Sequence, residues 1–308
     1  MIHDFAMWRG DRAFVRSLLP GARAVLDRFV GDADADELVQ SPQGWNFGVP
    51  PGGQAGQVSG VHNWHVVYTW QKLAELEAYA GESELAGRAG RRAQTLADSV
   101  RKAFWDEARG LFADDLEHLR YSEHAQCMAV LSEHLTPQEL LRIARHLPTD
   151  GDLTRCSSYY SHYLFETCSR LGRHEVIWQH LTKWRAAVER GHTTFPETFG
   201  QTRSDCHAWS AHPLYHLLAT VLGVRPVAMG FETVAIFPQL GELRWASAAV
   251  AHPRGPIEIK VSRQGDQMQA DITLPAGLHG TLETRAQTLP LRPGRHELNW
   301  QSTAGPII

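Results

Sequence analysis

The chain has 308 residues, 43% of them hydrophobic and 21% charged, with a formal net charge of −4. This mild negative charge excludes a generally basic nucleic-acid binder, and no apolar run reaches the roughly 18–20 residues that a membrane span needs. The four cysteines form no CxxC pair and are too few for a disulfide framework. Because the N-terminus also lacks the apolar core of a signal peptide, we expect a cytoplasmic protein with reduced thiols.

Helical periodicity dominates the chain before residue 223. Gly81 is a predicted helix stop, Ser83 a predicted cap, and Thr136 with Glu139 a predicted capping box. The run GRAGRR (87–92) predicts a basic, solvent-exposed helix face. The predicted helices span residues 11–30, 57–81, 84–105, 122–134, 137–147, 157–172, 174–190 and 208–222.

Period-two alternation replaces the helical pattern from residue 224 onward. Pro, Gly and Asp separate the alternating runs, which predicts a small antiparallel β-sandwich. The sequence therefore predicts an α+β multidomain chain with a helical domain over 1–223 and a β-sandwich domain over 224–308. The predicted strands span residues 233–237, 242–252, 256–263, 268–275, 280–286 and 296–300.

Polar and aromatic residues crowd a loop near the end of the helical part. Glu197 follows a proline there, and Asp205, His207 and Trp209 come shortly after it. A carboxylate among aromatic side chains can have its pKa raised by desolvation, which suits it to exchange protons with water. Hydrolysis of a sugar needs such a carboxylate, a second one opposite, and aromatic walls.

Two other interpretations of this loop compete with catalysis. Glu197 could simply form an ion pair with Arg203. Asp205, His207 and His212 could ligate a metal, but their spacing does not place all three on one helix face. We therefore predict no metal site and no cofactor.

Three stretches around this loop carry a resemblance to a known family. They are TTFPET (193–198), RSDCHAWSAHPLYHLLATVLGVRP (203–226) and the run that begins GFETVAIF (230–237). They resemble the C-terminal part of bacterial α-L-rhamnosidases, the inverting enzymes of glycoside hydrolase family 78. WNF (45–47) and SEHAQ (122–126) match further loops of that family. The resemblance implies an (α/α)6-type barrel followed by a β-sandwich, and a carbohydrate as the partner.

The resemblance also implies roles for individual residues. Glu197 matches the general base of the family, which activates a water, and His207 matches a histidine that lines the sugar pocket. Trp45 and Asn46 fall in a loop of the same pocket. The expected substrate-binding set is completed by His124, Arg203, Asp205 and Trp209.

Two departures from the family pattern change what we expect. The general acid of the family lies in a motif that precedes the hairpin matching the start of this chain, so the resemblance places it before Met1. The helical part then corresponds to an incomplete barrel, whose open face a second copy of the chain could cover as a homo-oligomer. After WNF, Gly48 and Val49 stand where related sequences have an Asp-Trp pair. Glu123 and Glu166 are candidates for a replacement acid.

Two alternatives to a rhamnosidase-like hydrolase stay open. The chain could be a non-catalytic carbohydrate-binding or scaffold relic of the barrel. It could also be a hydrolase or lyase for another sugar on the same fold, such as a uronic acid. An anionic substrate of that kind would need cationic side chains in the pocket, for which Arg203 and Arg155 are the nearest candidates.

Overall fold

The computed structural model describes residues 1–31, 37–41 and 56–301. Its backbone forms two compact units. The helical unit is Arg12–Leu171, and the sandwich unit combines Met1–Asp11 with the chain from Gly172 onward. Compactness thus groups the last helices with the strands, and the domain boundary between residues 223 and 224 stays a prediction.

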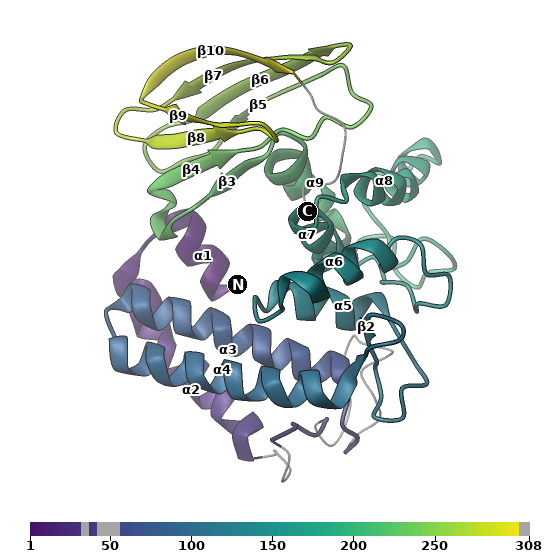
Figure 1. Cartoon of the computed structure of the whole chain (residues 1–308). Helices are drawn as coiled ribbons and strands as arrows, with labels where there is room; N and C mark the ends of the chain where they lie inside the picture. Colours follow the sequence, from purple (N-terminus) through teal and green to yellow (C-terminus); the bar gives the residue numbers. More distant parts are fainter. Residues whose placement is uncertain (32–36, 42–55, 302–308) are drawn as a thin grey trace. The chain divides into compact units, whose positions relative to one another are not determined.

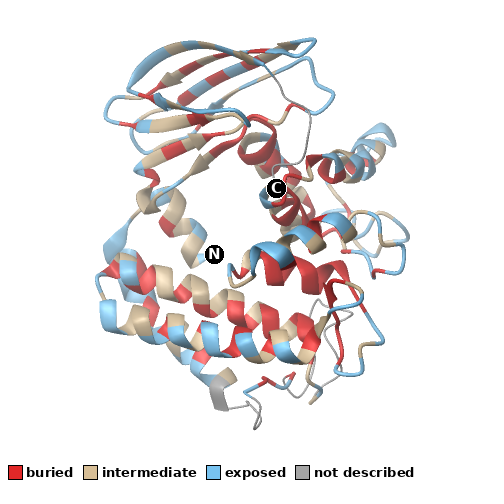
Figure 2. Cartoon of the chain, viewed as in Figure 1, coloured by how far each residue is buried: buried red, intermediate tan, exposed pale blue. Residues whose placement is uncertain are grey.

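Helix α3 is the central element of the helical unit (Figure 1). It packs against α2, α4 and α5, and α5 packs in turn against α7. A helix with neighbours on several sides needs apolar residues around most of its surface, and α3 buries side chains along its whole length (Figure 2). In chain order the elements of this unit are α2 (Arg12–Gly31), α3 (Gly60–Ala80), α4 (Ser83–Phe104), β1 (Trp105–Asp106), β2 (Leu111–Phe112), α5 (Glu123–Leu131), α6 (Pro137–His146) and α7 (Ser161–Arg170).

Local chemistry fixes several helix ends. Gly81 ends α3 in the left-handed conformation with φ 87°, as predicted. Thr136 and Glu139 form the predicted capping box at the start of α6. The predicted Ser83 cap is wrong, because Ser83 is already the first helical residue of α4 and Glu82 occupies the cap position without a side-chain hydrogen bond.

The sandwich unit contains two four-stranded sheets (Figure 1). Their strand orders are β10-β7-β6-β5 and β3-β4-β8-β9. The strands are β3 (Val224–Pro226), β4 (Thr233–Ile236), β5 (Trp245–Val250), β6 (Ile257–Gln264), β7 (Gln267–Leu274), β8 (His279–Glu283), β9 (Thr288–Leu291) and β10 (Gly294–Gln301). The remaining elements of the unit are α1 (Ile2–Arg9), α8 (His174–Glu189), the 3-10 turn η1 (Ala208–Ala211), α9 (Pro213–His216), the π-helical turn η2 (Leu217–Val221) and the 3-10 turn η3 (Met229–Phe231).

One strand pairing departs from the predicted antiparallel pattern. β4 and β8 run parallel, with Val234 opposite Gly280. Parallel neighbours need a long crossover connection. Here β5, β6 and β7 of the other sheet supply it, so the chain leaves the first sheet after β4 and returns to it at β8.

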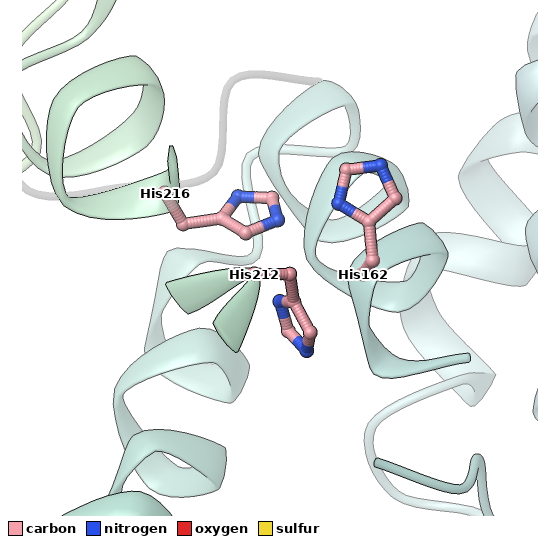
Figure 3. Close-up of side chains that lie close together, drawn as sticks. All are labelled: His162, His212 and His216. Atoms are coloured by element: carbon pink, nitrogen blue, oxygen red, sulfur yellow. The ribbon is translucent and has the colours of Figure 1, made fainter. Parts of the chain in front are cut away.

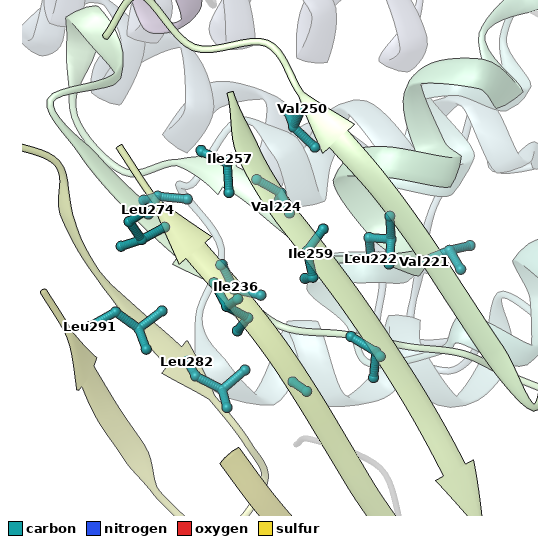
Figure 4. Close-up of a cluster of buried hydrophobic side chains, with 14 of the residues drawn as sticks. Val221, Leu222, Val224, Ile236, Val250, Ile257, Ile259, Leu274, Leu282 and Leu291 are labelled. Carbon is teal, nitrogen blue, oxygen red and sulfur yellow. The ribbon is translucent and has the colours of Figure 1, made fainter. Parts of the chain in front are cut away.

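Both sheets contribute to one hydrophobic core (Figure 4). Along β6, the buried residues Ile257, Ile259 and Val261 alternate with exposed ones, and Val234 and Ile236 of β4 face the same core. Burying one such side chain contributes roughly 1.5–3 kcal/mol. The predicted order of a helical region followed by a β-sandwich is therefore confirmed.

The helical periodicity of the sequence did not mark helix α1, although the resemblance placed a helical hairpin at the start of the chain. The only buried residue of α1 is Ala6, so it lacks the apolar stripe that marks an amphipathic helix. Trp8 nevertheless packs α1 against the rest of the sandwich unit. The Trp8 ring lies edge-on to Phe231 and to Tyr215, with centroids 5.0 Å and 6.1 Å away. The predicted helix over 208–222 is in fact broken into η1, α9 and η2. None of the described helices is long and apolar enough to cross a bilayer.

Candidate active site

Two main-chain hydrogen bonds fold the loop between α8 and η1 back on itself. The N–H of Glu197 donates to the carbonyl of Ser204 at 2.9 Å, and the N–H of His207 donates to the carbonyl of Phe195 at 2.8 Å. These bonds pair the two arms of the loop. Glu197 and His207 are therefore neighbours in space, on opposite arms of the same loop.

Buried groups beneath the loop hold it against α8. The hydroxyl of Ser210 donates to the carbonyl of Pro196 at 2.7 Å, and the indole N–H of Trp184 donates to the carbonyl of Ser210 at 2.6 Å. Ser210 and Trp184 are both buried, and the Trp184 ring packs edge-on against Phe199 at 4.6 Å. The residue that precedes Glu197 is thus connected through two buried hydrogen bonds to a long helix.

Glu197 forms a bidentate ion pair with Arg203. The guanidinium donates from Nη2 to Oε1 and from Nε to Oε2, both at 2.8 Å. The Glu197 side chain is 16% exposed and that of Arg203 is 78% exposed. The carboxylate therefore lies partly shielded in the loop, and the arginine covers it from the solvent side.

The pKa of Glu197 is lowered, which corrects the raised pKa expected from the sequence. The hydrogen bonds from Arg203 are the largest cause, and they outweigh the desolvation that acts in the opposite direction. The positive charge of Arg203 lowers the pKa further. Glu197 is consequently ionised at neutral pH, which is the state that a general base requires.

His207 and Trp209 complete the group around the carboxylate. Nε2 of His207 lies 3.9 Å from Oε1 of Glu197, and its Nδ1 lies 2.8 Å from the hydroxyl of Ser204. The imidazole and the Trp209 ring are tilted against each other with centroids 4.4 Å apart. The loop therefore brings a carboxylate, a guanidinium, an imidazole and an indole together, and all four belong to the predicted set.

Asp205 contributes to the loop through its main chain. Its carbonyl accepts a hydrogen bond from the hydroxyl of Thr194 at 2.6 Å, while its side chain is exposed. Among the described residues, Asp205, His207 and His212 do not bring three ligand atoms together. The metal alternative considered for this set thus has no support in its geometry, and a substrate contact of Asp205 stays a prediction.

Two further histidines extend the aromatic cluster below the loop. The rings of His212 and His216 are perpendicular with centroids 5.5 Å apart (Figure 3). His212 also packs edge-on against Trp184 at 5.1 Å, and Nδ1 of His216 lies 3.1 Å from the hydroxyl of Thr220. His162, labelled in the same picture, belongs to α7 of the helical unit.

His124 and Glu123 are both buried at the start of α5 in the helical unit. The His124 side chain is 1% exposed and its ring lies 4.3 Å from that of Tyr160. Burial lowers the pKa of His124 to about 4, so its ring is neutral at pH 7. The Glu123 carboxylate accepts from Arg155 at 2.8 Å and from the N–H of Cys156 at 2.7 Å. Glu123 therefore holds the backbone in place, whereas a substrate contact of His124 stays a prediction.

The remaining predicted residues, Trp45 and Asn46, lie outside the described residues. Sequence reasoning did not single out Trp184 or Ser210, which fix the loop from below. Trp184 lies on α8, the helix that precedes the loop, and no local signal connects it to Glu197. Ser210 falls inside the stretch that resembles the rhamnosidases, so its position was available as a signal.

We expect Arg203→Gln to raise the pKa of Glu197 toward the ordinary glutamate range. Arg203 stabilises the ionised carboxylate, so its removal favours the protonated form and moves the titration midpoint to higher pH. The measurement is a ¹³C NMR titration of the glutamate side chains, with the Glu197 signal assigned through Glu197→Gln. An exposed arginine outside the loop, Arg185 of α8, is replaced in the control variant Arg185→Gln. An unchanged midpoint in Arg203→Gln would show that the ion pair does not persist in solution.

The fold is that of an α+β protein, and the loop that holds the Glu197–Arg203 pair precedes the strands of the β-sandwich. Comparison with known proteins narrows the class of protein further. The family model of the bacterial alpha-L-rhamnosidase C-terminal domain matches residues 223–298. No curated protein sequence matches the chain. The predicted resemblance to the C-terminal part of bacterial α-L-rhamnosidases is confirmed by this match and by the solved structures.

Three solved rhamnosidase structures resemble the chain. The GH78 family rhamnosidase of Bacillus sp. GL1 is 25% identical with a TM-score of 0.82, over 91% of this chain and 32% of that one. The rhamnosidase from Klebsiella oxytoca with rhamnose bound is 25% identical with a TM-score of 0.62, over 70% of this chain and 44% of that one. The Streptomyces avermitilis α-L-rhamnosidase complexed with L-rhamnose is 14% identical with a TM-score of 0.78, over 96% of this chain and 32% of that one, a likeness of fold. The chain thus spans about a third of the Bacillus and Streptomyces enzymes.

Proposed function

We propose that this chain carries catalytic machinery of an α-L-rhamnosidase-like, inverting glycoside hydrolase, with Glu197 as the general base. The observation that carries the proposal is the ionised, arginine-clamped Glu197 beside His207 and Trp209, in a chain that resembles the Bacillus rhamnosidase with a TM-score of 0.82. The substrate class is a glycoside with a terminal sugar. L-rhamnose is the first sugar to test, because two similar structures hold rhamnose.

The clamp by Arg203 leaves Glu197 able to accept a proton. A carboxylate has about four lone-pair positions on its two oxygens, and Arg203 uses one on each oxygen. The free positions can accept a hydrogen bond from a water molecule. In the proposed reaction this water gives a proton to Glu197 while its oxygen bonds to the anomeric carbon, and the glycosidic C–O bond breaks.

In inverting enzymes a second carboxyl group on the other side of the sugar protonates the leaving oxygen. p-Nitrophenolate is a stable anion and can leave without that proton, so hydrolysis of a p-nitrophenyl glycoside tests Glu197 and its water on their own. In inverting enzymes the two carboxyl groups lie about 6.5–9.5 Å apart, which leaves room for the water. Glu123 is a poor candidate for this acid, since it is buried and engaged with Arg155 and Cys156. The aromatic face of Trp209 beside His207 offers an apolar wall for the sugar ring.

The test is the release of p-nitrophenol from a panel of p-nitrophenyl glycosides that includes the α-L-rhamnoside. We expect wild type to hydrolyse the rhamnoside and Glu197→Gln to lose about 10²–10⁴-fold in kcat/KM, the range for removal of a general base. Glu189→Gln is the matched control, because Glu189 is an exposed glutamate at the end of α8.

Absence of hydrolysis in both folded proteins would instead favour the non-catalytic alternative. L-rhamnose should then still bind to the wild type, and the binding should weaken in Trp209→Ala. Hydrolysis that survives in Glu197→Gln would remove Glu197 from the reaction. Hydrolysis of a uronic-acid glycoside in preference to the rhamnoside would favour the third alternative, in which Arg203 faces an anionic sugar.

A further inference from the structure

A basic pocket lies in the helical unit, along α3 between α2 and α4. Its volume is about 400 Å³, within the usual range of small-molecule sites. Figure 1 shows the three helices side by side. The pocket is lined by Asp27 of α2, Trp70 of α3, and Arg88, Arg91, Arg92 and Thr95 of α4.

Helical spacing explains why the arginines of α4 gather here. Arg88, Arg91, Arg92 and Thr95 stand at positions i, i+3, i+4 and i+7, which lie on one face of a helix. The sequence alone indicated only a solvated basic face for this run. The structure adds that this face borders an open pocket whose other walls come from α2 and α3.

The positive charge of the pocket is only partly neutralised. Arg92 pairs with Glu37 at 3.2 Å. In the part of the chain that the structure describes, Arg88 and Arg91 form no ion pair. Asp27 contributes the one carboxylate of the lining. Two arginines of the lining therefore form no direct ion pair, although the charge of Arg88 also acts on the buried carboxylate of Glu77.

The other walls suit a ligand with a ring-shaped body. Trp70 is 6% exposed, so it forms a rigid apolar part of the wall. Asp27 is exposed on α2, and a carboxylate accepts hydrogen bonds from hydroxyl groups but repels an anion that lacks them. The pocket thus combines donors for an oxyanion, an apolar wall and an acceptor for hydroxyls.

We propose that this pocket binds a ligand that carries an oxyanion, with Arg88 and Arg91 as its cationic contacts. The planar guanidinium fork matches both carboxylate and phosphate oxygens. Since Asp27 also offers an acceptor, a carboxylated sugar fits the lining better than a bare anion. The site lies entirely in the helical unit, whereas Glu197 lies in the sandwich unit.

The test is isothermal titration calorimetry of the full chain with D-glucuronate, D-glucose and inorganic phosphate. We expect saturable binding of glucuronate that weakens as salt is added, and no binding of glucose. Arg88→Gln and Arg91→Gln should each weaken glucuronate binding by at least about tenfold, as the loss of a charge-assisted hydrogen bond predicts. Arg185→Gln, an exposed arginine of α8, should leave it unchanged.

The titration with phosphate distinguishes the two possible ligands, a carboxylated sugar and a bare oxyanion. Phosphate that binds as tightly as glucuronate would identify a bare oxyanion as the ligand. Asp27→Asn should then tighten phosphate binding, because a like charge is removed. The proposal is overturned if neither anion binds saturably, or if both bind equally well to Arg88→Gln, Arg91→Gln and wild type. Because the readout needs no hydrolysis, such a failure would leave the role of Glu197 untouched.

Discussion

Gly223→Ala is expected to destabilise the sandwich unit by about 4 kcal/mol or more, at the extreme end of single substitutions. Gly223 has φ +73°, and a Cβ built on it would lie 2.0 Å from the carbonyl oxygen of Phe237 and 2.2 Å from its carbonyl carbon. These are backbone atoms, so no side-chain rotation can relieve the clash.

The surrounding structure resists a backbone shift at this position. The N–H of Phe237 donates to the carbonyl of Gly223 at 3.0 Å, and the N–H of Gln239 donates to the carbonyl of Val221 at 2.8 Å. The neighbours Leu222 and Val224 are core residues. Moving the two segments apart would therefore break hydrogen bonds and open the hydrophobic core at the same place.

The measurement for Gly223→Ala is urea unfolding of the full chain, followed by circular dichroism. Gly265→Ala is the matched control, because Gly265 has φ +59° but nothing within 4 Å of the added Cβ. It isolates the cost of the left-handed backbone, roughly 1–2 kcal/mol. If Gly223→Ala were no more destabilising than Gly265→Ala, the close approach to Phe237 would not exist in solution.

Local signals in the sequence predicted the local features of the fold. Gly81 ends α3 and the Thr136–Glu139 box starts α6, because both act on backbone groups within one turn. The short strands β3 and β9 were missed, since Pro226 and Pro290 interrupt the alternation that marks a strand. The parallel pairing of β4 with β8 could not be predicted, because it depends on partners brought together by the rest of the sandwich.

The candidate site shows the same division between local and distant information. The Glu197–Arg203 ion pair was predicted as one of three interpretations of the loop, because both residues belong to it. The direction of the Glu197 pKa was wrong, since desolvation was weighed without the geometry of the guanidinium. The hydrogen bond from Trp184 that supports the loop could not be predicted, because it depends on how α8 packs against the loop.

Asp114→Asn is expected to remove a large part of the pH dependence of the stability of the helical unit. The Asp114 side chain is 1% exposed. One oxygen accepts a hydrogen bond from the hydroxyl of Ser122 at 2.7 Å, and the other has no partner among the described residues. Burial raises its pKa to about 7, against the opposing effects of Ser122 and Arg120, while Asp115 raises it further.

The direction of this pH dependence follows from the pKa of Asp114 in the folded and the unfolded chain. The unfolded carboxyl has its ordinary pKa near 4, so between about pH 4 and 7 the folded state binds more protons, and the free energy of unfolding falls as pH rises. A shift of about three pKa units corresponds to a loss of roughly 4 kcal/mol, complete above pH 7. Asparagine is neutral throughout and keeps an acceptor for Ser122. Wild type should therefore lose more stability than Asp114→Asn between pH 5 and 8.

Urea unfolding of the full chain at pH 5 and pH 8 measures this difference, and hydrogen exchange of the α3 and α5 amides assigns it to the helical unit. Asp152→Asn is the control, because Asp152 is an exposed aspartate of the same unit. At pH 8 the gain in Asp114→Asn should be smaller than the full ionisation cost, since its amide brings donors to an oxygen position that lacks a partner. Parallel pH profiles for wild type and Asp114→Asn would mean that water or a local opening solvates Asp114. If wild type loses stability more steeply with rising pH than both Asp114→Asn and the control do, Asp114 is a buried carboxyl that is protonated in the folded state below neutral pH.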